Sequence, residues 1–384
     1  MDQTTFDLLS PCPATPPYGG AQADPVGRSG FQIGWDHAHH ALVPPAELLL
    51  DGTPVAQGWM AARAVFGRRT LAASRQVRLW LQLRTQAWRA GLAFDELQVT
   101  PHYLGQIHAE RCPVLRQPLG GAAGTALAPV VERLNPQAGF AAGNLMTMSL
   151  AASQARQGLG LQDLVRRARQ AEICGGAVAG LSAAAWWRLA TLTALVLPAD
   201  HLPFHTAARL PMAVLPPNRV RVLNAAQGLQ ALVTQLFLRP GWAARARALA
   251  ALLPAHTLRH DFNLFVGAMA PRVLEAGGNP AGFRAAIEDA WLHERVQRRW
   301  HHFVLGLGET ACDALLAHAT QAGLAGLAGV STITHAADQA VEGRASPTGK
   351  ATAFPSAPLQ RGGGGFTLPR PPKKRSATTG ARLS

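Results

Sequence analysis

Proline-containing breaks divide the second half of this sequence and limit what the segments between them can form. The breaks are Leu215-Pro216-Pro217-Asn218, Arg239-Pro240-Gly241 and Leu253-Pro254. A proline inside a helix removes a backbone hydrogen bond and clashes with the preceding turn, so helices tend to end at such positions. The intervening residues are rich in Ala, Leu and Arg, which favour helices. We therefore expect a mainly α-helical protein, with residues 161–335 forming a helical domain.

The apolar segment 181–197 raises the question of a membrane span. Arg188 stands near its centre, and Thr191 and Thr193 dilute it further. An arginine in the middle of a bilayer costs about 3 kcal/mol, and the segment is at the short limit for spanning. We predict instead a buried helix of a soluble protein, with Ser182 as its N-cap and no membrane association.

Another helix is predicted to begin at Asn279-Pro280, because asparagine caps helices and proline suits the first turn. A buried stripe is expected to follow as far as about Val304. Its members are Phe283, Ile287, Trp291, Trp300 and Phe303.

Both ends of the chain are biased in composition, and we predict that they are disordered. The predicted arm covers residues 1–30 and the predicted basic tail covers residues 336–384, so residues 31–160 and 161–335 are the two folded blocks. The tail holds eight basic residues and two acidic ones, which is +6 of the chain's net charge of +14. About +8 remains elsewhere, which makes binding to nucleic-acid phosphates plausible.

The cysteines Cys12, Cys112, Cys174 and Cys312 are too sparse for a disulfide framework. The first 13 residues also lack the basic start and apolar run of a secretory signal. We therefore predict reduced thiols and a cytoplasmic location.

Residues 61–94 contain seven arginines and no acidic residue. A helix predicted from about Thr70 to Ala90 has apolar residues on one side and Arg75, Arg78 and Arg89 on the other. Because a solvated face usually mixes charges, this face is a candidate phosphate-binding surface. An ordinary exposed face is the alternative.

The most informative segment covers residues 108–158. It begins with His108 and Cys112-Pro113, and a Gly-rich loop leads to Val130-Val131-Glu132-Arg133-Leu134-Asn135-Pro136. Gly143-Asn144-Leu145 and a predicted helix through Arg156 follow. This order resembles the HNH endonuclease family, in which a Cys-Pro knuckle precedes two strands and a helix, the ββα module.

The resemblance implies metal-dependent cleavage of DNA. In that family, a hairpin and a helix hold one divalent metal against the scissile phosphate, and a histidine activates water. Carried over to this sequence, Glu132 matches the acidic ligand of a metal such as Mg²⁺ or Mn²⁺. Asn144 matches the asparagine that fixes the geometry of the histidine.

Other positions depart from the family pattern. Arg133 stands where the general-base histidine would be, and Ser153 stands at the position of the helix His or Asn. Ser149 and Ala152 occupy the second knuckle positions, and Cys112 has no partner three or four residues on, so no zinc site is expected. Arginine cannot act as a base at neutral pH, although it can bind a phosphate bidentately.

Histidines elsewhere could supply the missing base. His102 and His108 precede the hairpin, and His37, His39 and His40 form the densest group of potential ligands. On a strand, His37 and His39 would share one face and could bind a metal, whereas a polar loop is the alternative.

Three functions remain open from the sequence. The first is noncatalytic binding of nucleic acid, most simply DNA. The second is active metal-dependent cleavage, and the third is a helical scaffold that binds another protein. The candidate catalytic residues are Glu132, Arg133, Asn144 and His108, and the further candidate phosphate contacts are Arg75, Arg78, Arg89, Arg116 and Arg156.

Overall fold

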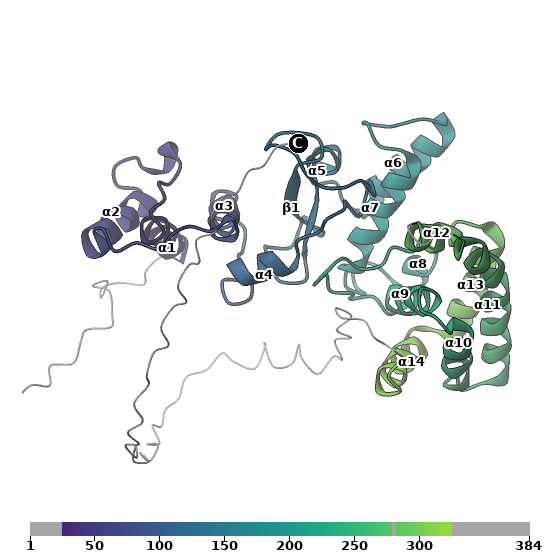
Figure 1. Cartoon of the computed structure of the whole chain (residues 1–384). Helices are drawn as coiled ribbons and strands as arrows, with labels where there is room; N and C mark the ends of the chain where they lie inside the picture. Colours follow the sequence, from purple (N-terminus) through teal and green to yellow (C-terminus); the bar gives the residue numbers. More distant parts are fainter. Residues whose placement is uncertain (1–24, 279–281, 325–384) are drawn as a thin grey trace, which may run out of the picture. The chain divides into compact units, whose positions relative to one another are not determined.

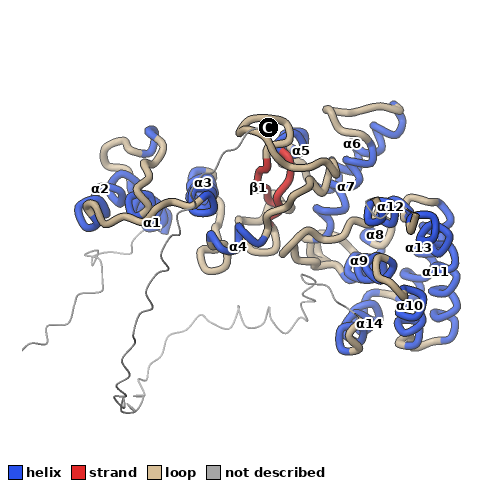
Figure 2. Tube along the Cα trace, in the orientation of Figure 1, coloured by secondary structure: helices blue, strands red, loops and turns tan. Residues whose placement is uncertain are grey.

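The structure, a computed structural model, describes residues 25–278 and 282–324 (Figure 1). Within these ranges the protein is mainly helical, and one two-stranded antiparallel hairpin is followed directly by a helix (Figure 2). The predicted fold class is confirmed. The elements up to that helix are α1 (Pro25–His39), the 3-10 helix η1 (Ala46–Leu48), α2 (Pro54–Phe66), α3 (Arg75–Arg89), α4 (Pro101–Gln106), β1 (Pro129–Arg133), β2 (Leu145–Ser149) and α5 (Leu150–Arg156).

The rest of the described chain is helical, and the three predicted proline breaks separate α8 from α9, α9 from α10 and α10 from α11. Helix α1 begins inside the residues predicted as a flexible arm, and the predicted tail, 336–384, lies outside the described residues. The remaining elements are α6 (Leu161–Cys174), α7 (Ala183–Leu195), α8 (Phe204–Ala207), α9 (Ala225–Phe237), α10 (Trp242–Ala251), α11 (His256–Ala276), α12 (Phe283–Ala290), α13 (Glu294–Leu307) and α14 (Glu309–Gln321).

The apolar segment forms helix α7, as predicted, and every residue from Ala185 to Leu195 is buried. The side chain of Ser182 caps the helix by accepting a hydrogen bond from the N–H of Ala185. No helix in the described ranges is long and apolar enough to cross a membrane.

The predicted buried stripe is confirmed for Ile287, Trp291, Trp300 and Phe303, whereas Phe283 is half-buried. Two helices, α12 and α13, cover this region, and Trp291 to His293 lie between them. Trp291 is nevertheless buried, with its ring perpendicular to that of Trp300 at 5.0 Å. The apolar spacing therefore identified core residues correctly but not the turn between them. The predicted start, Asn279-Pro280, lies outside the described residues.

The hairpin buries one strand more deeply than the other. Strand β2 is buried throughout, whereas β1 is half-buried along its length. Met146 and Met148 of β2 belong to the same hydrophobic cluster as Trp186 of α7 and Trp300 of α13. The boundary predicted at residue 160 therefore lies within one continuous core.

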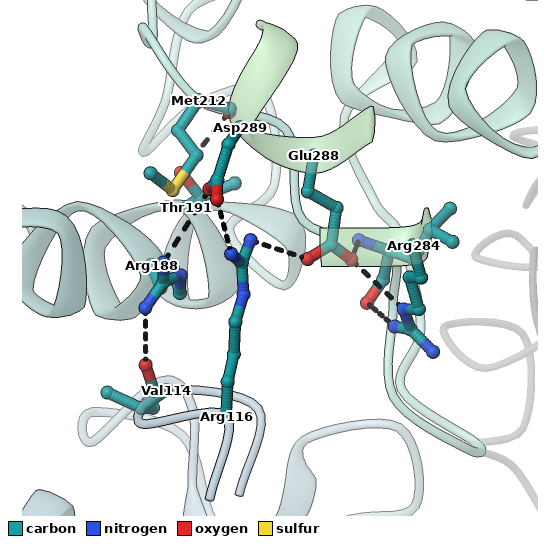
Figure 3. A network of polar contacts seen from close by, with 9 residues as sticks. Val114, Arg116, Arg188, Thr191, Met212, Arg284, Glu288 and Asp289 are labelled. Carbon is teal, nitrogen blue, oxygen red and sulfur yellow. Dashed lines mark hydrogen bonds and ion pairs between the residues drawn. The ribbon is translucent and has the colours of Figure 1, made fainter. Parts of the chain in front are cut away.

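A polar network also joins the segment before the hairpin to the later helices (Figure 3). Arg116 adopts a left-handed backbone conformation, and its guanidinium contacts Glu288 at 3.0 Å and Asp289 at 2.6 Å. Arg188 of α7 contacts Asp289 at 3.6 Å and donates a hydrogen bond to the carbonyl of Val114. Burial lowers the pKa of Arg188. Glu288 is buried, so its carboxylate offsets cationic charge in a place with little solvent.

Glu288→Ala is expected to destabilise the protein by about 1–3 kcal/mol, because the guanidinium of Arg116 loses its buried partner and keeps only the half-exposed Asp289. The matched control is Asp163→Ala, since the Asp163–Arg166 pair is exposed and should contribute less than about 1 kcal/mol. Urea unfolding of the two variants measures the difference. Equal effects would contradict a structural role for the network.

Helices α1 and α2 approach each other through two glycines. A Cβ atom on Gly34 would lie 2.0 Å from the carbonyl oxygen of Val55, and one on Gly58 would lie 1.9 Å from that of Phe31. Backbone stands against backbone at both points, so no side-chain rotation could relieve the clash.

Gly58→Ala should therefore force the two helices apart. It should lower the free energy of unfolding by about 1–3 kcal/mol or more, and the melting temperature with it. Gly267→Ala on α11 is the control, since a Cβ there meets nothing within 4 Å. Alanine at this helical position should stabilise by up to about 1 kcal/mol. Thermal unfolding of both variants tests the prediction, and an unchanged Gly58→Ala would refute the close helix contact.

Candidate functional site

Arg133, at the end of β1, folds back onto the hairpin loop. Its Nη1 donates hydrogen bonds to the carbonyls of Pro136 at 2.6 Å and Ala138 at 2.8 Å. The guanidinium also lies over the ring of Phe140, 5.0 Å from its centroid. Burial lowers the pKa of Arg133, and the neighbouring Glu132 opposes this shift. Arg133 thus holds the loop in shape.

Asn144 closes the same loop from its other end. Its Oδ1 accepts a hydrogen bond from the N–H of Asn135 at 2.8 Å. Its Nδ2 donates to the carbonyls of Asn135 and Gly139, both at 3.1 Å. Among the described residues no histidine contacts Asn144. Asn144 is buried, and its side chain orients the backbone of the loop.

Arg156 is buried inside the module, with 2% of its surface exposed. It donates hydrogen bonds to the carbonyls of Arg133 and Leu134, which follow one another at the end of β1. Burial lowers its pKa to about 10, while Glu132 acts in the opposite direction. A guanidinium in this position cannot reach the phosphate backbone of a nucleic acid.

Two predicted phosphate contacts are therefore reassigned. Arg156 contacts backbone carbonyls inside the protein, and Arg116 is paired with Glu288 and Asp289. The sequence does not distinguish these two residues from exposed arginines, because it does not reveal the carboxylates and carbonyls that the fold brings near them.

Glu132 faces α5 rather than a group of metal ligands. Its Oε1 accepts a hydrogen bond from the hydroxyl of Ser153 at 2.6 Å, and both Arg133 and Arg156 exert electrostatic effects on it. In the described part of the chain, no three His, Cys, Asp or Glu side chains gather closely enough to hold a metal. One carboxylate beside two guanidiniums does not fit a divalent cation.

His108 is exposed in the loop after α4. Among the described residues it makes no hydrogen bond or ion pair with Glu132, Arg133 or Asn144. The carbonyl of the adjacent Ile107 accepts a hydrogen bond from the hydroxyl of Thr147 on β2, so His108 follows a residue bound to the hairpin without itself contacting the three side chains.

Cys112 and Ser149, at the two knuckle positions, do come together. The Sγ of Cys112 lies 3.3 Å from the Oγ of Ser149 and accepts hydrogen bonds from the N–H groups of Ser149 and Leu115, both at 3.4 Å. Ser149 also caps α5 by accepting from the N–H of Ala152. One buried thiol and one hydroxyl thus hold the segment before the hairpin against the start of α5.

The histidines near residue 40 lie on helix α1 and just after it, not on a strand or in the polar loop considered as its alternative. On a helix, His37 and His39 point in different directions and do not share a face. His37 is buried, with its Nδ1 2.7 Å from the carbonyl oxygen of Ile33, and His39 stacks on Phe66. Burial lowers the pKa of His37, although the hydrogen bond to Ile33 opposes the shift. These contacts favour a packing role.

The arginines of the segment 61–94 divide into those paired with carboxylates and those that are not, although Arg63 lies over the ring of Trp59 and Arg78 donates a hydrogen bond to the carbonyl of Ala73. Helix α3 begins at Arg75, not Thr70, and Ser74 caps it. Arg84 is buried between Asp36 and Glu96, and Arg89 forms an exposed pair with Glu47. In the described chain no carboxylate pairs with five exposed members of this segment, which are Arg63, Arg68, Arg69, Arg75 and Arg78.

A groove beside the hairpin loop was not predicted. It lies between the start of α4, the loop residues Ala142 and Gly143, and the segment that carries Arg219 and Arg221. Its volume is about 420 Å³. The sequence signal for this groove is the pair of arginines in Arg219-Val220-Arg221. The pair follows two prolines and has no acidic neighbour.

Comparison with the sequence profiles of known protein families, with curated proteins and with solved structures found no match. What the chain does must therefore be inferred from its own residues. Three of its features bear on function: the hairpin with α5, the unpaired arginines and the groove.

Asn144→Ala is expected to destabilise the protein by about 1–3 kcal/mol, because three backbone groups of the hairpin loop lose their partner. Asn135→Ala is the control, since the side chain of Asn135 accepts one hydrogen bond, from the exposed Gln137. It should cost less than about 1 kcal/mol. Chemical denaturation measures both variants. A smaller loss for Asn144→Ala than for Asn135→Ala would contradict its role in closing the loop.

Proposed function

We propose that this protein binds nucleic acid and that its HNH-like module contributes fold rather than cleavage. The observation that carries the proposal is the group of exposed arginines Arg63, Arg68, Arg69, Arg75 and Arg78, which are not paired with carboxylates in the described chain. Guanidinium groups bind phosphate oxygens in a bidentate manner and release counterions from the nucleic acid. The positive charge outside the tail is consistent with this partner.

The HNH-like origin of the module is supported by its order and by one contact. Strands β1 and β2 and helix α5 follow each other as the ββα arrangement requires. Cys112 and Ser149, at the two knuckle positions, lie against each other although no zinc ligand set is present in the described residues. These contacts would let a module keep its fold after losing its metal.

Loss of cleavage is supported by the uses of the side chains at the family's catalytic positions. Arg133 holds the hairpin loop, and Asn144 closes it. Glu132 accepts a hydrogen bond from Ser153 and lies near two guanidiniums. None of these side chains is placed to activate water.

We place the protein in the cytoplasm, because Cys112, Cys174 and Cys312 are free thiols.

A protein-binding scaffold is the second candidate. Several large apolar side chains are exposed on α2 and in the segments that connect the N-terminal helices, and such residues favour a protein partner where they form a continuous patch. They are Val43, Leu50, Met60, Val65 and Leu71. Association that is insensitive to salt, without binding of nucleic acid, would favour this function.

Binding of fluorescent duplex DNA, single-stranded DNA and RNA by the full chain tests the proposal. We expect affinity to fall steeply with salt and to be the same in Mg²⁺ and in EDTA. Arg68→Gln/Arg69→Gln should weaken duplex binding on the order of tenfold and reduce the slope of log affinity against log salt by about 1.8, or about 0.9 for each lost phosphate contact.

The control is Arg167→Gln/Arg169→Gln, which removes the same charge from two exposed arginines of α6. This variant should bind as the wild type does. An equal loss in both variants would mean that binding depends on net charge alone, and no binding at low salt would end the proposal.

A further inference from the structure

The groove beside the hairpin loop is lined by polar and cationic groups. In the described chain, no carboxylate lines it. The ring Nε2 of His102 lies 2.8 Å from the side-chain Nε2 of Gln106, so these two groups fix each other on one wall. The polar members of the lining are Gln98, Thr100, His102, Gln106, Arg219 and Arg221.

The walls of the groove are fixed in place through the peptide groups of Gly143. Its N–H donates a hydrogen bond to the hydroxyl of Tyr103 at 2.9 Å, and its carbonyl accepts one from the N–H of Arg221 at 3.0 Å. Gly143 has a φ of +94°, and a Cβ there would lie 2.8 Å from the Cβ of Arg221. Helix α4, the hairpin loop and the arginine segment are thus held together before any ligand arrives, which reduces the cost of binding.

The electrostatic character of the groove is cationic. Among the described residues neither Arg219 nor Arg221 has a carboxylate partner, and Arg219 is exposed. Burial raises the pKa of the Tyr103 hydroxyl, and the two guanidiniums act on it in the opposite direction. Asp95 also acts on Tyr103, but its side chain accepts a hydrogen bond from the N–H of Gln98 and does not line the groove. Two cations are therefore available to a ligand.

The groove fits an unpaired strand better than a duplex. A duplex is a convex cylinder, which does not enter a groove of this volume, whereas a single strand exposes both its backbone and its base edges. Glutamine amides can hydrogen-bond to base edges, and Leu97, which is 91% exposed, offers an apolar contact for a base.

We propose that this groove binds the phosphodiester backbone of single-stranded nucleic acid through Arg219 and Arg221. This inference rests on the proposed function, because it assigns a second and more selective contact to the same partner. The exposed arginines around α3 provide general attraction, and the groove provides the preference for unpaired nucleotides.

The test compares an oligothymidine single strand with a duplex of equal length. Arg219→Gln/Arg221→Gln should weaken binding of the single strand about tenfold at physiological salt. The reason is that each lost phosphate contact lowers the slope of log affinity against log salt by about 0.7. Arg219→Gln alone, at an exposed position, should weaken it about fourfold. Duplex binding should change much less. Arg167→Gln/Arg169→Gln, with the same charge change on α6, should leave both affinities unchanged.

Competition experiments with thymidine monophosphate and with inorganic phosphate test whether the groove binds a nucleic-acid strand or a small phosphate compound. Millimolar amounts of either should leave strand binding nearly unchanged. Displacement at low micromolar concentration would overturn the strand assignment in favour of a free nucleotide or phosphate. Wild-type binding that the groove variants do not alter would refute this inference and leave the proposed function standing. No binding by the wild type at low salt would refute both.

Discussion

The backbone carbonyls of a long hairpin loop must find hydrogen-bond donors, and this requirement organises the centre of the molecule. The loop between β1 and β2 cannot pair with itself along its whole length, so side chains supply the donors. Arg133 satisfies Pro136 and Ala138, Asn144 satisfies Asn135 and Gly139, and Arg156 satisfies Arg133 and Leu134. The loop so fixed presents Gly143 to α4 and to Arg221. The shape of the neighbouring groove therefore depends on these donors.

The same requirement divides the arginines into two groups. Buried guanidiniums such as Arg84, Arg156 and Arg188 are neutralised by carboxylates or bound to carbonyls, because an unpaired charge inside a protein is costly. Exposed guanidiniums such as Arg68 and Arg219 have no such partner in the described chain. Net charge alone could not distinguish the two groups, and only the second can bind an external phosphate.

Much of the fold was predictable, because local signals determine it. Ser182 and the apolar residues after it specify a capped, buried helix, and the prolines near residues 216, 240 and 254 end helices. The turn at Trp291 to His293 contains no proline or glycine, so it lacks the signal that marks the other breaks. The site was less predictable. The burial of Arg156 depends on carbonyls more than twenty positions away, and the groove depends on three segments that meet only in the folded chain.

The most direct test of the proposed loss of cleavage is to incubate supercoiled plasmid with the full chain in Mg²⁺, Mn²⁺ or Ni²⁺ and then to separate the products by electrophoresis. One gel reports binding as retardation and cleavage as conversion to nicked circles. The plasmid is predicted to be retarded by the protein and, after the protein is removed, to remain supercoiled in every metal. Nicked circles that form with the wild type and disappear with Glu132→Ala would contradict this account and establish an active metal site.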